Sequence, residues 1–191
     1  AGLILGGVLS FLMVERGEHI VVRWEIQWLI FLLPVLLYGF MMFRQPFPQS
    51  EAKAAGVSFG TMLKEFASPI LIALLLLHAM VGYVELGTDS WIANLMTNIA
   101  GMKGILLLVY TSSIMFALRF FAGPIVHRIS PLGLLFSCSV LAMIGLFWLG
   151  NSTAGMAVFL AATTYGVGKT FFWPTMLGVV SERFPKGGAL T

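Results

Sequence analysis

One lysine lies inside an apolar stretch of this sequence. Lys169 belongs to the apolar run Gly155–Val180, roughly 20 Å along a helix from Glu182. If that run crosses a bilayer, a lysine at this depth costs at least about 2.5–3.5 kcal/mol, so its ammonium group needs a cavity or a counter-ion. We therefore predict that Lys169 binds a solute or couples its movement. The alternative is a structural charge held by carbonyl groups or by a carboxylate.

Three further ionisable side chains lie in another apolar run. Glu85 and Asp89 are spaced i, i+4 and would share one face of an intact helix. They could hold a proton or a cation, or pair with Lys169; otherwise they form an acidic pair at the outer end of the helix. His78 matches Lys169 in depth and is a candidate for the same cavity, although a lone histidine on an apolar helix is usually a hydrogen-bonded packing residue.

Aromatic residues flank the lysine in the sequence: Tyr165, Phe171, Phe172 and Trp173. Rings beside a cation could form a wall on which a sugar or another ring stacks, and Tyr165 and Trp173 are the candidates for that role. The alternative is packing or contact with lipid. Gly166, Gly168 and Pro174 would loosen the same helix.

The sequence contains no motif for a cofactor, a metal or a catalytic nucleophile. It has no phosphate-binding Gly-x-x-x-x-Gly-Lys-Ser/Thr loop, no His-Glu-x-x-His, no Cys-x-x-Cys and no Gly-x-Ser-x-Gly elbow. We therefore predict that the protein is not an enzyme. The pI of about 9.3 could indicate nucleic-acid binding. The basic residues lie between apolar runs rather than in one patch, so no nucleic-acid partner is expected.

The composition indicates that these residues are carried by membrane helices. The 191 residues are 59% hydrophobic and only 10% charged, whereas average soluble chains are about 25% charged. The runs Gly104–Ala122 and Leu132–Gly150 are each close to the roughly 20 residues that a membrane-spanning helix needs. The short loop over 123–131 would join them into an antiparallel hairpin.

Four other stretches complete the predicted all-α, polytopic transmembrane bundle: part of a helix in Ala1–Val14, then Gln27–Phe43, Phe66–Ala100 and Gly155–Val180. Pro34 could kink the second of these. Phe66–Ala100 is longer than a bilayer requires, and its glycine-rich, acidic second half predicts an interrupted helix. The long polar connection Arg44–Leu63 would separate two groups of helices.

The basic residues orient this bundle, because loops on the cytoplasmic side carry more Lys and Arg. Most of them collect on one predicted side: Arg44, Lys53, Lys64, Arg119, Arg128, Arg183 and Lys186. The opposite side holds only Arg16, Arg23 and Lys103. We therefore predict a multi-pass protein of the inner (plasma) membrane, with loops 44–65, 123–131 and 181–191 in the cytoplasm.

The loop that begins at Gly123 resembles a signature of the major facilitator superfamily. That signature is Gly-x-x-x-Asp-Arg, and Gly123, His127 and Arg128 stand at its matching positions, with His127 in place of the aspartate. The segment Ser181–Pro185 is similar to the loop after the tenth helix of this family. Residues 119–124 and 182–190 also look like those of uncharacterised bacterial members near the sugar and nucleoside proton symporters.

The resemblance implies a fragment containing helices five (in part) to ten. Residues 1–43 would end the first helix bundle, 44–65 would form the cytoplasmic central loop, and 66–191 would hold the first four helices of the second bundle. The remaining helices of the parent chain would be its partners, together with the lipid bilayer. Transporters of this family rock two halves around a central site. Gly123 and Arg128 would then act as a cytoplasmic latch, in which Arg128 reaches a carboxylate or a helix C-terminus.

The resemblance thus implies a secondary active transporter of a small polar solute, working by alternating access. Lys169 and the helix carrying His78 and Glu85 would line its cavity, and protons could be coupled through Glu85 or Asp89. A passive facilitator or channel is the alternative function. An intramembrane enzyme or a non-transporting membrane sensor is a further one, with no second motif in its support.

Overall fold

The computed structural model describes residues 4–9, 24–49, 51–153 and 155–187. Over these residues the chain is all-helical and contains no β-strand, as the sequence predicts. Two helices are long and apolar enough to span a membrane, Pro69–Ala100 and Pro131–Gly150. Leu32–Met42 and Gly104–Phe120 are apolar but shorter.

The longest rod consists of α5 (Pro69–Gly82), η1 (Tyr83–Gly87) and α6 (Thr88–Ala100). It begins later than the predicted Phe66, because Ser68 is extended ahead of Pro69, and Pro69 occupies the first helical turn. The predicted interruption is confirmed: η1 is a turn of π-helix around Glu85. Such turns inside α-helices occur frequently at functional sites.

A helical hairpin follows, made of α7 (Gly104–Phe120), α8 (Ala122–Arg128) and α9 (Pro131–Gly150). The prediction of a loop over 123–131 is wrong in its first part, since α8 occupies it. Pro124 does not prevent this helix because it lies in the first turn, where the missing N–H has no helical partner. The hydroxyl of Ser130 accepts a hydrogen bond from the backbone N–H of Gly133 and so caps α9.

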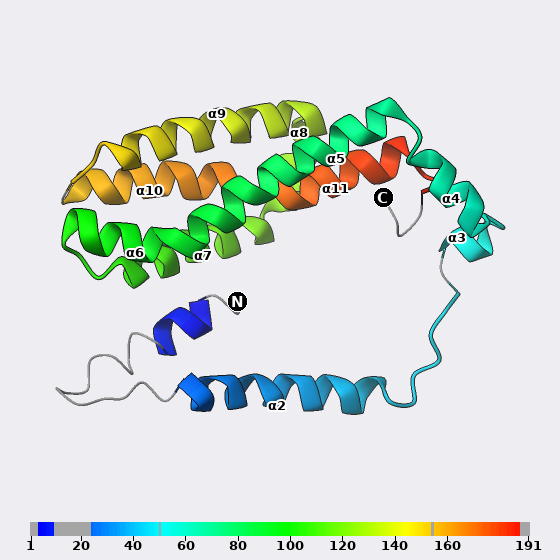
Figure 1. Cartoon of the computed structure of the whole chain (residues 1–191), viewed down its shortest axis with the longest axis horizontal. Helices are drawn as coiled ribbons and strands as arrows, with labels where there is room; N and C mark the ends of the chain where they lie inside the picture. Colours follow the sequence, from blue (N-terminus) through cyan, green and yellow to red (C-terminus); the bar gives the residue numbers. More distant parts are fainter. Residues whose placement is uncertain (1–3, 10–23, 50, 154, 188–191) are drawn as a thin grey trace.

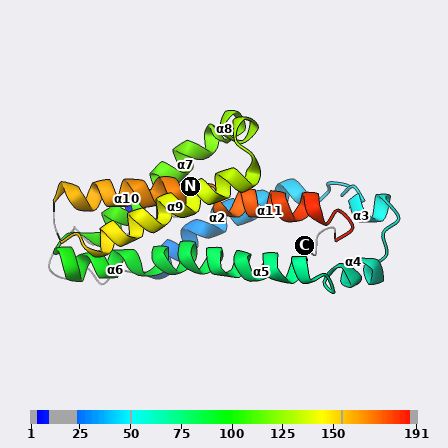
Figure 2. The same ribbon diagram turned by 90° about the horizontal axis from the view of Figure 1, so that it is seen from above.

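The predicted single helix over Gly155–Val180 is wrong. The chain forms α10 (Met156–Lys169) and α11 (Phe172–Arg183), with a break at Thr170 and Phe171. Pro174 explains the break, because a proline cannot donate to the carbonyl four residues earlier and its ring clashes there. Figures 1 and 2 show α10 and α11 following each other nearly end to end, along the rod of α5, η1 and α6.

Close packing between α9 and α10 sets the position of Lys169. A Cβ added to Gly145 would lie 2.4 Å from the backbone nitrogen of Tyr165, and one added to Gly168 would lie 2.4 Å from that of Ala142. These contacts leave no room for side chains, so glycine allows the two backbones to touch. Gly7, in a short helix over residues 4–9, packs against the side chain of Val109 in α7.

The remaining elements surround this bundle. Helix α2 (Trp24–Met42) contains Pro34 and lies apart from the other helices in Figure 1, with the side chains of residues 32–40 exposed. The polar connection after it is not a simple loop as predicted, because it forms α3 (Glu51–Ala54) and α4 (Phe59–Glu65). The side chain of Ser58 caps α4 by accepting a hydrogen bond from Thr61. The rest of predicted helix Ala1–Val14 lies outside the described residues.

Connections lie at both ends of the described helices. Figure 1 shows the connections after α6 and after α9 at one end, and α3, α4 and the end of α11 toward the other. Which end faces the cytoplasm stays a prediction.

Candidate functional site

Lys169 and Asp89 form a buried ion pair between α10 and α6. The Nζ of Lys169 donates to Oδ1 of Asp89; the lysine side chain is fully buried and that of the aspartate is 9% exposed. The Nζ also lies 5.2 Å from the centre of the Tyr165 ring, within the range of a cation–π contact. The structure therefore contains one of the pairings that the sequence allowed, that of Asp89 with Lys169. A role of Lys169 in solute binding stays a prediction.

A second pair of charges lies beside the first. Glu85, in η1, is buried, and its Oε1 lies 3.8 Å from Nη2 of Arg119 in α7. Its other oxygen, Oε2, is buried and has no hydrogen-bond partner among the described residues. This carboxyl group therefore has one weakly engaged oxygen and one with room for a proton. Glu85 and Asp89 do not form an exposed acidic pair, which was the alternative interpretation.

Arg119 is the residue whose role sequence analysis missed, since it was assigned only to the basic side of the membrane. Its Nε donates to the carbonyl oxygen of Thr170 at 3.1 Å. In a regular helix that carbonyl would accept from residue 174, but Pro174 has no N–H. A proline in an apolar helix, with an arginine at the end of a neighbouring apolar run, is the signal that could have found this contact.

The other predicted residues adjoin these charges. The hydroxyl of the fully buried Tyr165 donates to the carbonyl of Val84 in η1 at 3.2 Å. The His78 ring packs edge-on against Trp173, with 4.4 Å between ring centres, and Nε2 of His78 is buried without a partner in the described part of the chain. His78 and Trp173 thus join α5 to α11 beyond the break.

The predicted aromatic wall is only partly present. Tyr165, Phe171 and Phe172 all belong to a core cluster with Leu134, Cys138 and Ala142 of α9. Of the three rings, the structure gives a contact with the lysine ammonium group for Tyr165. Phe171 and Phe172 therefore fit the packing alternative.

Two charges of each sign meet at this site: Lys169 and Arg119 against Asp89 and Glu85. If both acids are ionised, the cluster carries no net charge. Pairing matters here because a buried charge left alone costs several kcal/mol. No group of three or more His, Cys, Asp or Glu side chains in the described residues is placed to hold a metal ion.

The predicted latch is not formed as expected. A Cβ on Gly123 would meet nothing within 4 Å, so this glycine does not permit a close approach. Arg128 is exposed at the end of α8 and makes no ion pair with any residue that the structure describes. The His127 side chain lies outside the described part.

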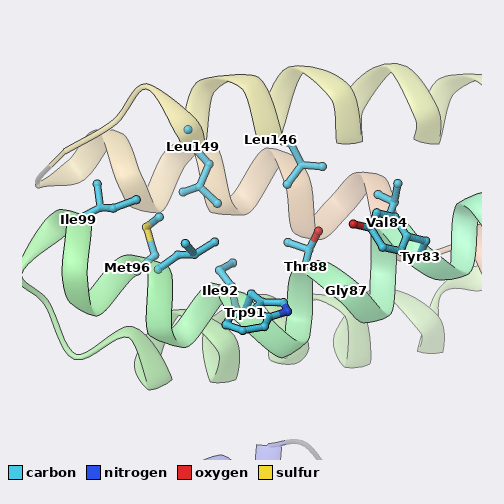
Figure 3. A pocket seen from close by; sticks show the side chains of 12 residues that line it. Tyr83, Val84, Gly87, Thr88, Trp91, Ile92, Met96, Ile99, Leu146 and Leu149 are labelled. Atoms are coloured by element: carbon cyan, nitrogen blue, oxygen red, sulfur yellow. The ribbon is translucent and has the colours of Figure 1, made fainter.

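An apolar groove of about 500 Å³ runs between α6 and α9. Figure 3 shows Trp91, Met96 and Ile99 of α6 beside it, with Leu146 and Leu149 of α9 on the opposite side. None of the four charged residues lines this groove. The groove therefore adjoins η1 through Val84 and Gly87, but the four charged side chains do not line it.

No protein-family model, no curated protein and no solved structure matches this chain.

Proposed function

We propose that this chain is part of a secondary active transporter that moves a small polar solute by alternating access, as in the major facilitator superfamily. The observation that carries the proposal is the buried Lys169–Asp89 ion pair between two apolar helices. Ionisable residues inside membrane helices are expensive, and they mark solute or ion pathways by default.

The two long apolar helices support a membrane location. Helix α6 adds a second argument, because it presents a polar, exposed face along an otherwise apolar rod: Ser90, Asn94, Thr97 and Asn98. Ser90 and Thr97 donate to carbonyls of their own helix and Asn98 donates to Asn94, so the helix satisfies part of this polarity itself. The amide groups that these bonds leave unsatisfied would still be unfavourable toward lipid. We infer that this face borders water and the moving solute, which suits a polar solute.

Glu85 is the better candidate for coupling to protons. Its Oε2 has no hydrogen-bond partner in the part of the chain that the structure describes, whereas Oδ1 of Asp89 accepts from the ammonium group of Lys169. Binding a proton at Glu85 would change the net charge of the cluster without breaking the Lys169–Asp89 pair. Coupling through Glu85 therefore needs no unpaired lysine in the interior.

The test uses the natural full-length protein in proteoliposomes, with a panel of small polar solutes and with or without a pH gradient. Lys169→Ala should lower uptake by at least about tenfold, a factor that needs only about 1.4 kcal/mol of lost stabilisation. The matched control is Lys186→Ala, an exposed lysine on the C-terminal side of α11, which should transport as the wild type does.

A structural role for the ion pair would give a different result. Asp89→Ala/Lys169→Met removes both charges and should restore folding but not uptake; full uptake by this folded variant would contradict the proposal. Flux that follows the solute gradient and ignores the pH gradient would instead indicate a passive facilitator or channel.

A further inference from the structure

Two interruptions of regular α-helix lie on opposite sides of Arg119. One is η1, which carries Glu85, and the other is the break between α10 and α11 at Thr170. The guanidinium group reaches both: Nε bonds the Thr170 carbonyl at 3.1 Å, and Nη2 lies 3.8 Å from Glu85 Oε1. Arg119 thus makes a polar link between α7 and the break.

The contact at the break compensates for a missing hydrogen bond. Pro174 leaves the Thr170 carbonyl without its helical donor, and the chain resumes with Thr175 donating to Phe171 at 3.1 Å. A cation at the carbonyl end of a helix is also favoured by the helix dipole. The break therefore depends on Arg119 in a way that an unbroken helix would not.

The contact at Glu85 is the weaker of the two. The charged or titratable groups around Glu85 are Arg119 from α7, Lys169 and Tyr165 from α10, and Asp89 from α6. Lys169 is already neutralised by Asp89. A proton on Glu85 would therefore leave Arg119 as the charge without a counter-ion. The Arg119 side chain is 40% exposed, so it has a path toward water.

We propose that Arg119 is a positioning residue that holds the α10–α11 break in this conformation, and that protonation of Glu85 releases it. Without a counter-ion, the 40% exposed Arg119 turns its charge toward water and leaves the Thr170 carbonyl. Helix α11 can then pivot at the break, which moves Trp173 against His78. The coupling of this movement to a solute rests on the proposed function. The movement itself does not, so the two can be tested separately.

The experiment measures the distance between α10 and α11 by double electron–electron resonance in the natural full-length protein. Spin labels are placed at two exposed positions, Leu160→Cys on α10 and Leu177→Cys on α11, in a Cys138→Ala background. We expect one distance at high pH and a second one that grows as the pH falls. Glu85→Gln should show mainly the second distance at every pH.

Arg119→Gln should likewise give mainly the second distance, and Arg119→Lys should give a mixture, because an ammonium group lacks the fork that reaches both partners. The matched control is Arg44→Gln, which changes an exposed arginine after α2 and should behave as the wild type does. A single wild-type distance in Arg119→Gln at every pH would overturn the proposal.

A rescue variant distinguishes this role from a general loss of structure. Pro174→Ala supplies the N–H that the Thr170 carbonyl lacks. The double variant Arg119→Gln/Pro174→Ala should therefore lose the second distance that Arg119→Gln shows. If Arg119→Gln alone does not fold, Arg119→Lys with and without Pro174→Ala gives the same comparison. In either case, a second distance that persists after Pro174→Ala contradicts the proposal. Proton-coupled uptake with an unchanging α10–α11 distance would refute only the proposed role of Arg119. A changing distance without uptake of any solute would refute only the transport function.

Discussion

The two ion pairs of the site differ in how firmly they are closed. Lys169 and Asp89 are both buried and in direct hydrogen-bonded contact. Arg119 Nη2 and Glu85 Oε1 are 3.8 Å apart, and the arginine is partly exposed. The other carboxylate oxygen, Oε2, has no partner among the residues that the structure describes. The difference teaches that neighbouring pairs of the same charges can have different uses, because burial and geometry decide how much it costs to separate them.

The largest expected effect comes from removing one partner of the Lys169–Asp89 pair. Asp89→Ala should lower the stability of the folded protein by about 3–5 kcal/mol, the usual cost of an uncompensated buried charge. The measurement is unfolding of the purified protein in detergent. Asp89→Ala/Lys169→Met should recover most of the loss; if the single variant is as stable as the wild type, Lys169 does not depend on its partner.

A smaller effect is expected from disturbing the helix that presents Lys169. Gly168→Val places a branched side chain where even a Cβ would lie 2.4 Å from the backbone nitrogen of Ala142. Overpacking of this kind costs about 1–3 kcal/mol. Gly178→Val on α11, where a Cβ would meet nothing within 4 Å, is the comparison at an open position. Equal thermal stability of the two variants would mean that α9 does not position the lysine.

The smallest effect is expected from the Arg119–Glu85 pair. Glu85→Gln should change stability by no more than about 1 kcal/mol, because the 40% exposed Arg119 keeps its contact with water when Glu85 loses its charge. Raising the salt concentration should reduce that difference further, because salt screens charges that reach solvent. The contribution of the Lys169–Asp89 pair to stability should not depend on salt. A large and salt-independent loss in Glu85→Gln would show that the two pairs are equivalent.

Much of the helical framework follows from local properties of the sequence. Apolar runs bounded by polar or proline-containing segments located α9 almost to the residue, and the glycines and acids after His78 indicated the interruption that η1 forms. The break before α11 was missed although Pro174 was noted as a loosening residue. A proline lowers the stability of a continuous helix, but only packing and a replacement donor determine whether the helix bends or ends.

The sequence by itself determined that Lys169 needs a partner, because a lone ammonium group in an apolar run is costly wherever that run lies. Only the tertiary structure decided that the partner is Asp89, and that Arg119 serves both Glu85 and the Thr170 carbonyl. These contacts join α6, α7 and α10, which are distant along the chain. The glycines determine how closely these helices approach, and the π-turn sets the direction of Glu85. Together they decide which side chains of the three helices meet.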